Sequence, residues 1–306
     1  MGRIAVVFAG QGAQAPGMGR SYYENSPAAR RTLDALEAAR PGTLHSCFAG
    51  SEAELRETRV TQPCLYAVET AAAAALTDAG VRADMTAGFS LGELSALVYA
   101  GALTPAQGMS LVTLRAEKMQ SAAEAHATGM AAVLKLTDAQ VEAICARFGR
   151  VWPVNFNCPG QVTCSGASEE MDGFLAAVKA AGGRAVPLKV SGAFHSPFMA
   201  EAARSFAAAL EKTAFAVPAI PVWSNATGAV YGADVRADLI PQIDHPVRWE
   251  TIIRGMIAAG ADTFLELGPG KTLTGLIRRI DGNVKAYSLA EYADLADYVI
   301  SHMISA

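Results

Sequence analysis

The segment "ADMTAGFSLGELSALV", residues 83–98, decides the fold because it joins a short strand to a helix through a sharp turn. Its first half is apolar enough for a buried strand, and beyond it Leu91, Leu94 and Val98 recur at helical spacing. Ser90 therefore falls at a strand-to-helix corner, within the pattern Gly-x-Ser-x-Gly, whose glycines tolerate a tight bend. The segment predicts a serine hydroxyl presented at the end of a strand.

Strands and helices alternate on both sides of this corner. "RIAVVFAG" predicts a buried strand, and "TQPCLYAVETAAAAALTDAG" predicts a helix that begins at Thr61. From about Gly129 the expected order is βαββαβ, that of a ferredoxin-like unit, with Ser168 capping its second helix and "RAVPLKV" as its last strand. We predict an α/β fold with a hydrolase-like large domain at residues 1–123 and 191–306 and an inserted small ferredoxin-like domain at 124–190.

Composition narrows the class of protein. The 306 residues are 51% hydrophobic, which is enough for a large core. The net charge is −4 and the basic residues are spread along the chain, so we expect no nucleic-acid or membrane partner. No apolar run approaches the ~20 residues of a membrane span or resembles a signal peptide, and the five cysteines show no C-x-x-C pair. A cytoplasmic protein with reduced thiols and no metal is expected.

A nucleophilic serine needs a base, and His195 is the best placed of the five histidines. In "SGAFHSPFM", Ser196 and Pro197 predict the start of a helix, whose positive end would keep the preceding imidazole neutral. The preceding segment, "AGGRAVPLKVSGAF", offers no obvious acidic partner, which favours a Ser-His dyad oriented by a backbone carbonyl. The alternative is a loop histidine that only packs against neighbouring phenylalanines.

Arg115 lies on the apolar flank of a predicted helix, "TPAQGMSLVTLRAEKMQ", between Leu111 and Met119. A buried guanidinium needs an anion, because an unpaired buried charge strongly destabilises a fold. That anion is either a structural carboxylate or a substrate carboxylate held bidentately. The sequence leaves both open.

Two backbone N–H groups are candidates for stabilising an oxyanion. One belongs to Leu91, at the start of the helix after the serine. The other belongs to Gln11 in "FAGQGAQAPGMG", a loop that formally matches a dinucleotide-binding pattern. Pro16 follows where that pattern requires the first turn of a helix, so we reject a nucleotide site and expect the loop to present Gln11 to a neighbouring site.

Together these stretches resemble the malonyl-CoA:acyl carrier protein transacylases, the acyltransferases of fatty acid and polyketide synthesis. The resemblance covers essentially the whole chain, and each motif alone is only modestly specific. The motifs, in order, are "GQGAQ", "TQP", "GFSLGE", "LVTLRAEKMQ", "VNFNCPGQV", "GAFHSPFM", "PVRW" and "ELGPGKTLTGL". So many motifs in this order make coincidence improbable.

The resemblance implies a role for each candidate. Ser90 would carry the acyl group, His195 would be the base and acid, and Arg115 would hold the malonyl carboxylate. Gln11 and Leu91 would supply the oxyanion-hole N–H groups. The acyl group would come from malonyl-CoA and pass to the phosphopantetheine thiol of an acyl carrier protein, with no metal or redox cofactor.

Other positions refine or qualify this assignment. Gln242, in the stretch before "PVRW", matches the family residue whose backbone carbonyl orients the histidine. Phe194 resembles the bulky residue that malonyl-selective members have before the histidine. Leu91, after the nucleophile, fits the same preference. Phe89 stands where the family usually has His, Leu94 where Tyr is common, and Cys158 where Ser is common. The first two changes remove hydrogen-bonding groups near the site.

Two other functions remain open. A thioester hydrolase on the same fold would remove acyl groups from carrier proteins, but a hydrolase for neutral chains has no use for a buried Arg115. An inactive carrier-protein docking subunit is disfavoured by the presence of Ser90, His195 and Arg115 together, whereas Phe89 keeps it open. The sequence does not distinguish a fatty acid from a polyketide pathway.

Overall fold

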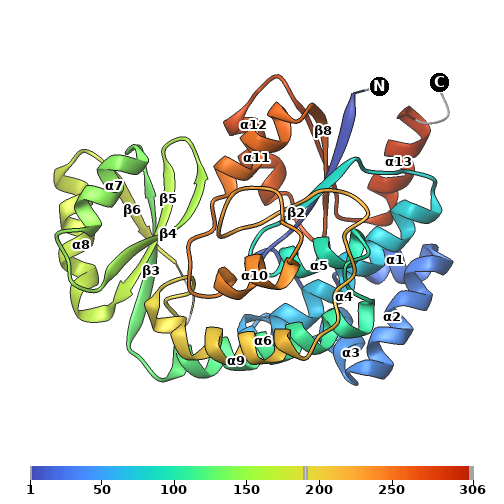
Figure 1. Ribbon diagram of the computed structural model, residues 1–306, viewed down its shortest axis with the longest axis horizontal. Helices are drawn as coiled ribbons and strands as arrows, with labels where there is room; N and C mark the ends of the chain where they lie inside the picture. The colour runs from blue at the N-terminus through green and yellow to red at the C-terminus, as the bar shows by residue number, and fades with distance from the viewer. Residues whose placement is uncertain (1, 189, 191, 303–306) are drawn as a thin grey trace.

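The structure, a computed structural model, describes residues 2–188, 190 and 192–302. A larger part contains a five-stranded parallel sheet, and a smaller part contains a four-stranded antiparallel sheet (Figure 1). The predicted α/β class with an inserted small domain is confirmed. The predicted domain limits at residues 1, 191 and 306, and Lys189 in the last predicted strand, lie outside the described residues.

Strand β1 (Arg3–Phe8) is the centre of the large sheet, whose order is β7-β2-β1-β8-β9 with every neighbouring pair parallel. Val6 and Phe8 pack into one hydrophobic cluster, whereas Ala5 and Val7 pack into another. A strand buried on both faces explains the unbroken apolar run in the sequence. The other strands are β2 (Met85–Gly88), β7 (Val222–Trp223), β8 (Ala261–Leu267) and β9 (Lys285–Leu289).

Helices cover both faces of this sheet. The cluster of Val6 and Phe8 takes in α1 (Arg20–Asn25), α2 (Pro27–Ala39), α3 (Thr43–Ala49), α4 (Thr58–Asp78), α5 (Gly92–Tyr99), α6 (Pro105–Glu124), α9 (Ala200–Glu211), α10 (Val235–Leu239) and α13 (Tyr292–His302). The opposite cluster takes in α11 (Trp249–Ala258) and α12 (Thr272–Ile280). Short 3₁₀ turns occupy Glu54–Arg56, Pro197–Met199 and Ile240–Gln242.

Helix α4 begins earlier than the sequence predicts. It starts at Thr58 and continues through Pro63, so the predicted start at Thr61 is wrong. Proline has no N–H for the carbonyl four residues before it, which is that of Arg59. The Arg40 guanidinium donates to this carbonyl at 3.2 Å. A contact from another helix thus replaces the missing hydrogen bond, and no local sequence pattern reveals it.

The smaller sheet has the order β4-β5-β3-β6 and only antiparallel pairs. Its elements are β3 (Thr128–Leu134), α7 (Asp138–Cys145), β4 (Val151–Cys158), β5 (Gln161–Ala167), α8 (Ser168–Ala180) and β6 (Arg184–Pro187), in the βαββαβ order predicted. Ser168 does not cap α8, because Ala167 is the N-cap and the Ser168 N–H donates to Ala127 O. The limits of the inserted domain, 124–190, stay a prediction.

A short backbone contact joins the small sheet to the large part of the molecule. Phe156 N donates to Val247 O at 2.9 Å, and Val247 N donates to Val154 O at 2.8 Å. Strand β4 of the small sheet is thereby joined to the segment that leads into α11. Figure 1 shows α6 and α9 side by side along the lower edge, where they run from the large part toward the small one.

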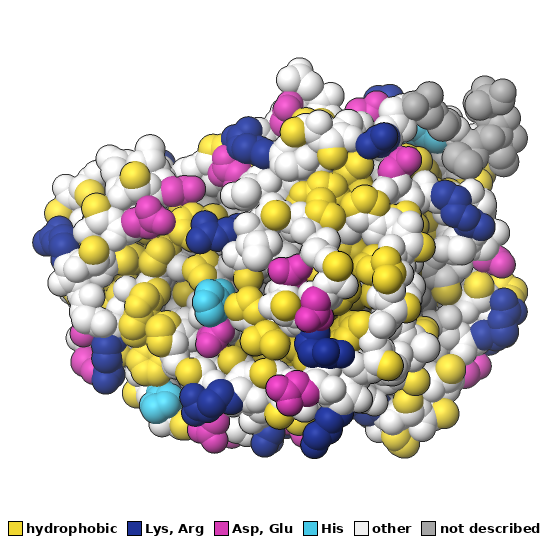
Figure 2. All heavy atoms as spheres, in the orientation of Figure 1, with side chains coloured by type: hydrophobic (Ala, Val, Ile, Leu, Met, Phe, Trp, Pro, Cys, Tyr) yellow, Lys and Arg dark blue, Asp and Glu magenta, His cyan; other side chains and the backbone are white. Residues whose placement is uncertain are grey.

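The surface carries mixed charge. On the face shown in Figure 2, basic and acidic side chains are interspersed, and hydrophobic side chains gather on the small part at the left and over the middle of the large part. Among the described residues, no helix is long and apolar enough to cross a membrane. All five cysteines are buried free thiols.

We expect Gly92→Ala to lower the free energy of unfolding by about 2 kcal/mol, because overpacking of this kind typically costs ~1–3 kcal/mol. A Cβ at Gly92 would lie 2.4 Å from Phe8 O, so α5 would have to move away from β1. Gly275→Ala is the matched control, since a Cβ there meets nothing within 4 Å and alanine favours a helix. Urea denaturation of both variants tests this, and a Gly92→Ala protein as stable as the control would contradict it.

Candidate active site

The predicted corner at Ser90 is present between β2 and α5. Ser90 adopts a left-handed backbone conformation, with φ of 53°, which is rare for a residue other than glycine. A Cβ at Gly88 would lie 1.9 Å from the backbone of Gly92, so this turn closes only with glycine there. Phe89 N donates to Phe8 O at 3.0 Å and ties the turn to β1.

Ser90 and His195 form a hydrogen-bonded pair. Ser90 Oγ lies 2.7 Å from His195 Nε2, and His195 Nδ1 lies 3.1 Å from Gln242 O and 3.2 Å from His245 O. Carbonyl oxygens only accept, so Nδ1 carries the proton and Nε2 is left to accept from the serine. The structure brings Gln242 to the place expected of it and adds His245, which the sequence did not suggest. No carboxylate among the described residues bonds this ring.

His195 is held neutral. Burial and the positive charge of Arg115 lower its pKa to about 3, against the opposing effect of the two carbonyls. Ser196 does cap the following 3₁₀ turn, with its Oγ accepting from Phe198 N at 3.3 Å. The low pKa thus agrees with the prediction that the imidazole is neutral. The cause differs from the predicted one, since burial and the Arg115 cation lower the pKa and the positive end of a helix does not.

Arg115 is fully buried beside the pair. Its Nε donates to Gln242 Oε1 at 3.0 Å, its Nη1 to Gln62 Oε1 at 2.7 Å and its Nη2 to Ser90 Oγ at 3.0 Å. All three acceptors are neutral, and no ion pair joins Arg115 to a carboxylate in the described part of the chain. Burial lowers its pKa to about 10, so it is still a cation at neutral pH. The site holds a buried positive charge with no anion in contact.

A small cavity opens over these groups. It measures about 100 Å³, and Ser90, His195 and the buried Phe194 all line it. It shares five lining residues with a neighbouring cavity of about 250 Å³ between the two sheets, namely Gln11, Phe89, Asn155, Thr163 and Leu188. Ser90 is therefore reached from the boundary between the two parts of the molecule.

Gln11 and Leu91 lie next to the nucleophile from two directions. Gln11 follows β1 and lines both cavities, and its Nε2 donates to Thr58 Oγ1 at 3.1 Å. Leu91 precedes the first residue of α5. Their backbone N–H groups donate to no residue that the structure describes. Gln11 therefore borders the space that a ligand would enter, whereas Leu91 is fully buried and lines neither cavity.

The three departures from the family pattern have structural explanations. The Phe89 ring packs edge-on against Trp249, with centroids 5.5 Å apart, and forms an apolar wall of both cavities. Leu94 and Cys158 are fully buried in the hydrophobic clusters. The hydrogen-bonding groups usual at the first two positions are replaced by packing.

Several site residues were not predicted from the sequence. Gln62 belongs to the quoted "TQP" motif, but its contact with Arg115 required the fold. A hydrogen-bonded chain of buried side chains supports the turn at Ser90, and it consists of Asn225, Glu93 and Tyr231. Burial raises the pKa of Glu93 to about 7, against the effect of hydrogen bonds from Tyr231 and Asn225. The sequence around Asn225, "SNATG", indicates a turn and gives no sign of a contact with Ser90.

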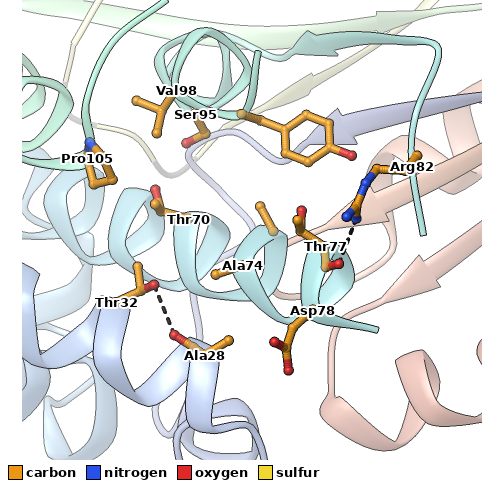
Figure 3. Close-up of a pocket in the computed structure, with 12 residues that line it drawn as sticks. Ala28, Thr32, Thr70, Ala74, Thr77, Asp78, Arg82, Ser95, Val98 and Pro105 are labelled. Carbon is orange, nitrogen blue, oxygen red and sulfur yellow. Dashed lines mark hydrogen bonds between the residues drawn. The ribbon is translucent and has the colours of Figure 1, made fainter. Parts of the chain in front are cut away.

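A larger pocket of about 580 Å³ lies elsewhere, between α2, α4 and α5 (Figure 3). The Thr32 hydroxyl donates to Ala28 O and the Arg82 guanidinium to Thr77 O, so these groups are already satisfied. No histidine lines it. Among the described residues no group of three or more His, Cys, Asp or Glu could hold a metal ion.

Comparisons with known proteins identify the family that the chain resembles over most of its length. Residues 5–291 match the family model described as an acyl transferase domain. The malonyl CoA-acyl carrier protein transacylase of Bacillus subtilis is 37% identical over 300 residues, which cover 95% of this chain and 94% of that protein. The crystal structure of the Xanthomonas oryzae transacylase has a TM-score of 0.93 at 38% identity, with 98% of each chain covered. A malonyl transacylase in complex with a type II polyketide acyl carrier protein has a TM-score of 0.94 at 34% identity and covers 98% of this chain and all of that one.

We expect NMR of the imidazole nitrogens to show His195 neutral, with the proton on Nδ1, throughout about pH 5 to 8, because its pKa is near 3. Arg115→Ala should raise this pKa, since the guanidinium no longer opposes the imidazolium ion. A His195 imidazole that becomes protonated within this pH range would contradict the assignment.

Proposed function

The chain belongs to the acyl transferase domain family and transfers malonyl groups from malonyl-CoA to an acyl carrier protein, and we propose that it does so through an ester on Ser90. The observation that carries this proposal is the buried Arg115 cation, which donates to Ser90 Oγ and contacts no anion. A nucleophile beside a cation that no carboxylate contacts suits an acyl group that carries its own carboxylate.

In the first half-reaction His195 Nε2 takes the proton from Ser90 Oγ, which attacks the thioester carbonyl of malonyl-CoA. The tetrahedral oxyanion collapses to malonyl-Ser90 as the coenzyme A thiolate leaves and takes the proton from His195. In the second half-reaction the phosphopantetheine thiol of the carrier protein attacks the ester, His195 accepts the thiol proton, and Ser90 Oγ leaves and regains it. Atoms and charges balance in each half, with no metal or redox cofactor.

Gln11 and Leu91 are our choice for the oxyanion donors. Both N–H groups are unpaired among the described residues, whereas the Ser90 N–H donates to Asn225 Oδ1. A donor of this kind contributes about 3 kcal/mol to transition-state stabilisation in measured cases. The positive end of α5 adds to the effect at Leu91.

The malonyl carboxylate would take the place of two neutral acceptors on Arg115. Nη1 now donates to Gln62 Oε1 and Nη2 to Ser90 Oγ, so one of the two nitrogens contacts the nucleophile itself. Gln242 holds the remaining Nε and keeps the guanidinium plane fixed. A bidentate pair with a carboxylate is the strong geometry for arginine. This cation disfavours a hydrolase of neutral acyl chains, and the connected dyad disfavours an inactive docking subunit.

Phe194 supports a preference for malonyl over methylmalonyl groups. Its ring is 7% exposed and lines the same small cavity as Ser90. An α-methyl group on the acyl chain would need space in this cavity, and one methyl in a pocket is worth ~1–3 kcal/mol of discrimination. The position of Leu91 after the nucleophile fits the same preference.

The cavity between the two sheets would admit the phosphopantetheine arm. Asn155 and Asn157 line it, and their Oδ1 atoms have no partner among the described residues. The arm carries amide N–H groups that could donate to these oxygens. Because all five thiols are free, we place this reaction in a reducing compartment, the cytoplasm.

Incubation with malonyl-CoA should add one malonyl group per chain, detected by intact mass and mapped to Ser90 by peptide analysis. The adduct should disappear on addition of a holo acyl carrier protein, which gains the same mass. Ser90→Ala should form no adduct, because the attacking oxygen is absent. An adduct on another residue in this variant would contradict the nucleophile assignment.

Arg115→Ala should reduce kcat/KM for malonyl-CoA by about 100-fold or more and reduce it far less for acetyl-CoA, because only the malonyl group offers a carboxylate. Arg115→Lys keeps the charge but loses the two-pronged contact, so its loss with malonyl-CoA should be intermediate. Steady-state rates with both substrates provide the comparison. Equal losses for malonyl- and acetyl-CoA would show that Arg115 is structural.

A further inference from the structure

A side-chain amide fills the inside of the nucleophile turn. Asn225, two residues after β7, is 1% exposed. It accepts from Ser90 N through Oδ1 at 2.6 Å and donates through Nδ2 to Gly88 O at 2.6 Å. Gly88 O can only accept and Ser90 N–H can only donate, so the amide has one possible orientation here. An ionised carboxylate of the same size accepts from the N–H but has no donor for the carbonyl.

Asn225 is itself fixed by α5, the helix that follows Ser90. Its backbone N–H donates to Glu93 Oε1 at 2.9 Å, and the Tyr231 hydroxyl donates to the same oxygen at 2.6 Å. Glu93 is fully buried in the first turn of α5, and Tyr231 is 8% exposed. On the other side, Arg248 N donates to Asn225 O at 3.0 Å. The loop after β7 is therefore latched to the nucleophile helix through buried contacts.

These contacts occupy the backbone of Ser90 completely. Its N–H donates to Asn225 Oδ1, and its carbonyl accepts from Gln242 Nε2 at 2.5 Å and from Glu93 N at 3.2 Å. The left-handed conformation of Ser90 is unfavourable for a residue with a side chain and persists only where the surroundings impose it. With the backbone held, only the side-chain torsion of Ser90 remains free.

We propose that Asn225, held by Glu93 and Tyr231, is a positioning residue that fixes the Ser90 backbone. It keeps Oγ directed at His195 Nε2 and leaves the next N–H, that of Leu91, for the oxyanion. The inference rests on the proposed role of Ser90 as nucleophile. It also explains why the oxyanion donors are Leu91 and Gln11: the serine N–H is already engaged.

The test compares Asn225→Ala, Asn225→Asp and Tyr231→Phe with wild type. Asn225→Asp keeps the shape and an acceptor for Ser90 N–H but has no donor for Gly88 O. Tyr231→Phe removes one hydroxyl that does not contact Ser90. Thr227→Ala is the matched control, because Thr227 is exposed in the same turn and its hydroxyl accepts only from Ala229 N.

Each protein is mixed with malonyl-CoA, and the rate and amplitude of the burst of coenzyme A release are measured together with thermal unfolding. The Asn225 variants should acylate about 100-fold more slowly, as expected for a misplaced nucleophile, with an amplitude still near one per folded chain. Tyr231→Phe should lose about fivefold, in line with one hydrogen bond, and Thr227→Ala should match wild type. A merely structural role would lower the melting temperature or the amplitude and leave the rate per active site unchanged.

A phosphonofluoridate separates this inference from the proposed function. Ser90 Oγ forms a bond to phosphorus, fluoride leaves, and His195 accepts the serine proton, without recognition of a malonyl group. If wild type failed to load malonyl-CoA, the proposed function would fall, while a slower phosphonylation of Asn225→Ala would still support positioning. Wild-type rates of both reactions in folded Asn225→Ala would overturn the inference. Should that variant not fold, a wild-type rate in Tyr231→Phe would overturn it.

Discussion

Helix α5 can begin against the end of β1 only because no side chain stands between them. The backbone of Gly92 approaches Phe8 O so closely that a single added carbon would lie 2.4 Å away. This contact forces the chain to turn within two residues of β2 and puts Ser90 in a left-handed conformation. The hydroxyl, the N–H of Leu91 and the first turn of the helix all take their positions from it. The reactivity of the site thus begins as a constraint on backbone packing.

The buried Arg115 cation influences the basicity of His195 and is also the proposed binding group for the acyl carboxylate. Arg115 lowers the pKa of His195, and only neutral groups hold it in the free protein. A carboxylate bound to Arg115 would cancel much of that positive charge, and the imidazole would become a stronger base. If Arg115 holds the acyl carboxylate as proposed, an acyl group that carries one would assist its own transfer. A neutral acyl group would leave the pKa of His195 unchanged.

The parts of the site that follow from local sequence were predictable, and those set by distant contacts were not. Ser90, Leu91 and the helix after them arise from neighbouring residues, so glycine spacing and apolar periodicity suffice. Asn225 reaches Ser90 across 135 positions, and its own surroundings indicate only a turn. The predicted start of α4 was wrong because of a distant contact of the same kind. The Arg40 guanidinium satisfies the backbone carbonyl that Pro63 leaves without a hydrogen bond. The family resemblance located Gln242, but its second contact, with Arg115, needed the fold.

Burial of every cysteine has a consequence for a catalyst whose substrates are thiols and thioesters. All five thiols are free and inaccessible, and burial raises the pKa of Cys158, which keeps its sulfur protonated. An acyl group on Ser90 therefore meets no competing sulfur within its own chain. Because the cysteines lie in the core, the acyl group cannot pass from Ser90 to a thiol of the same chain. The ester persists until a thiol from another molecule enters the site.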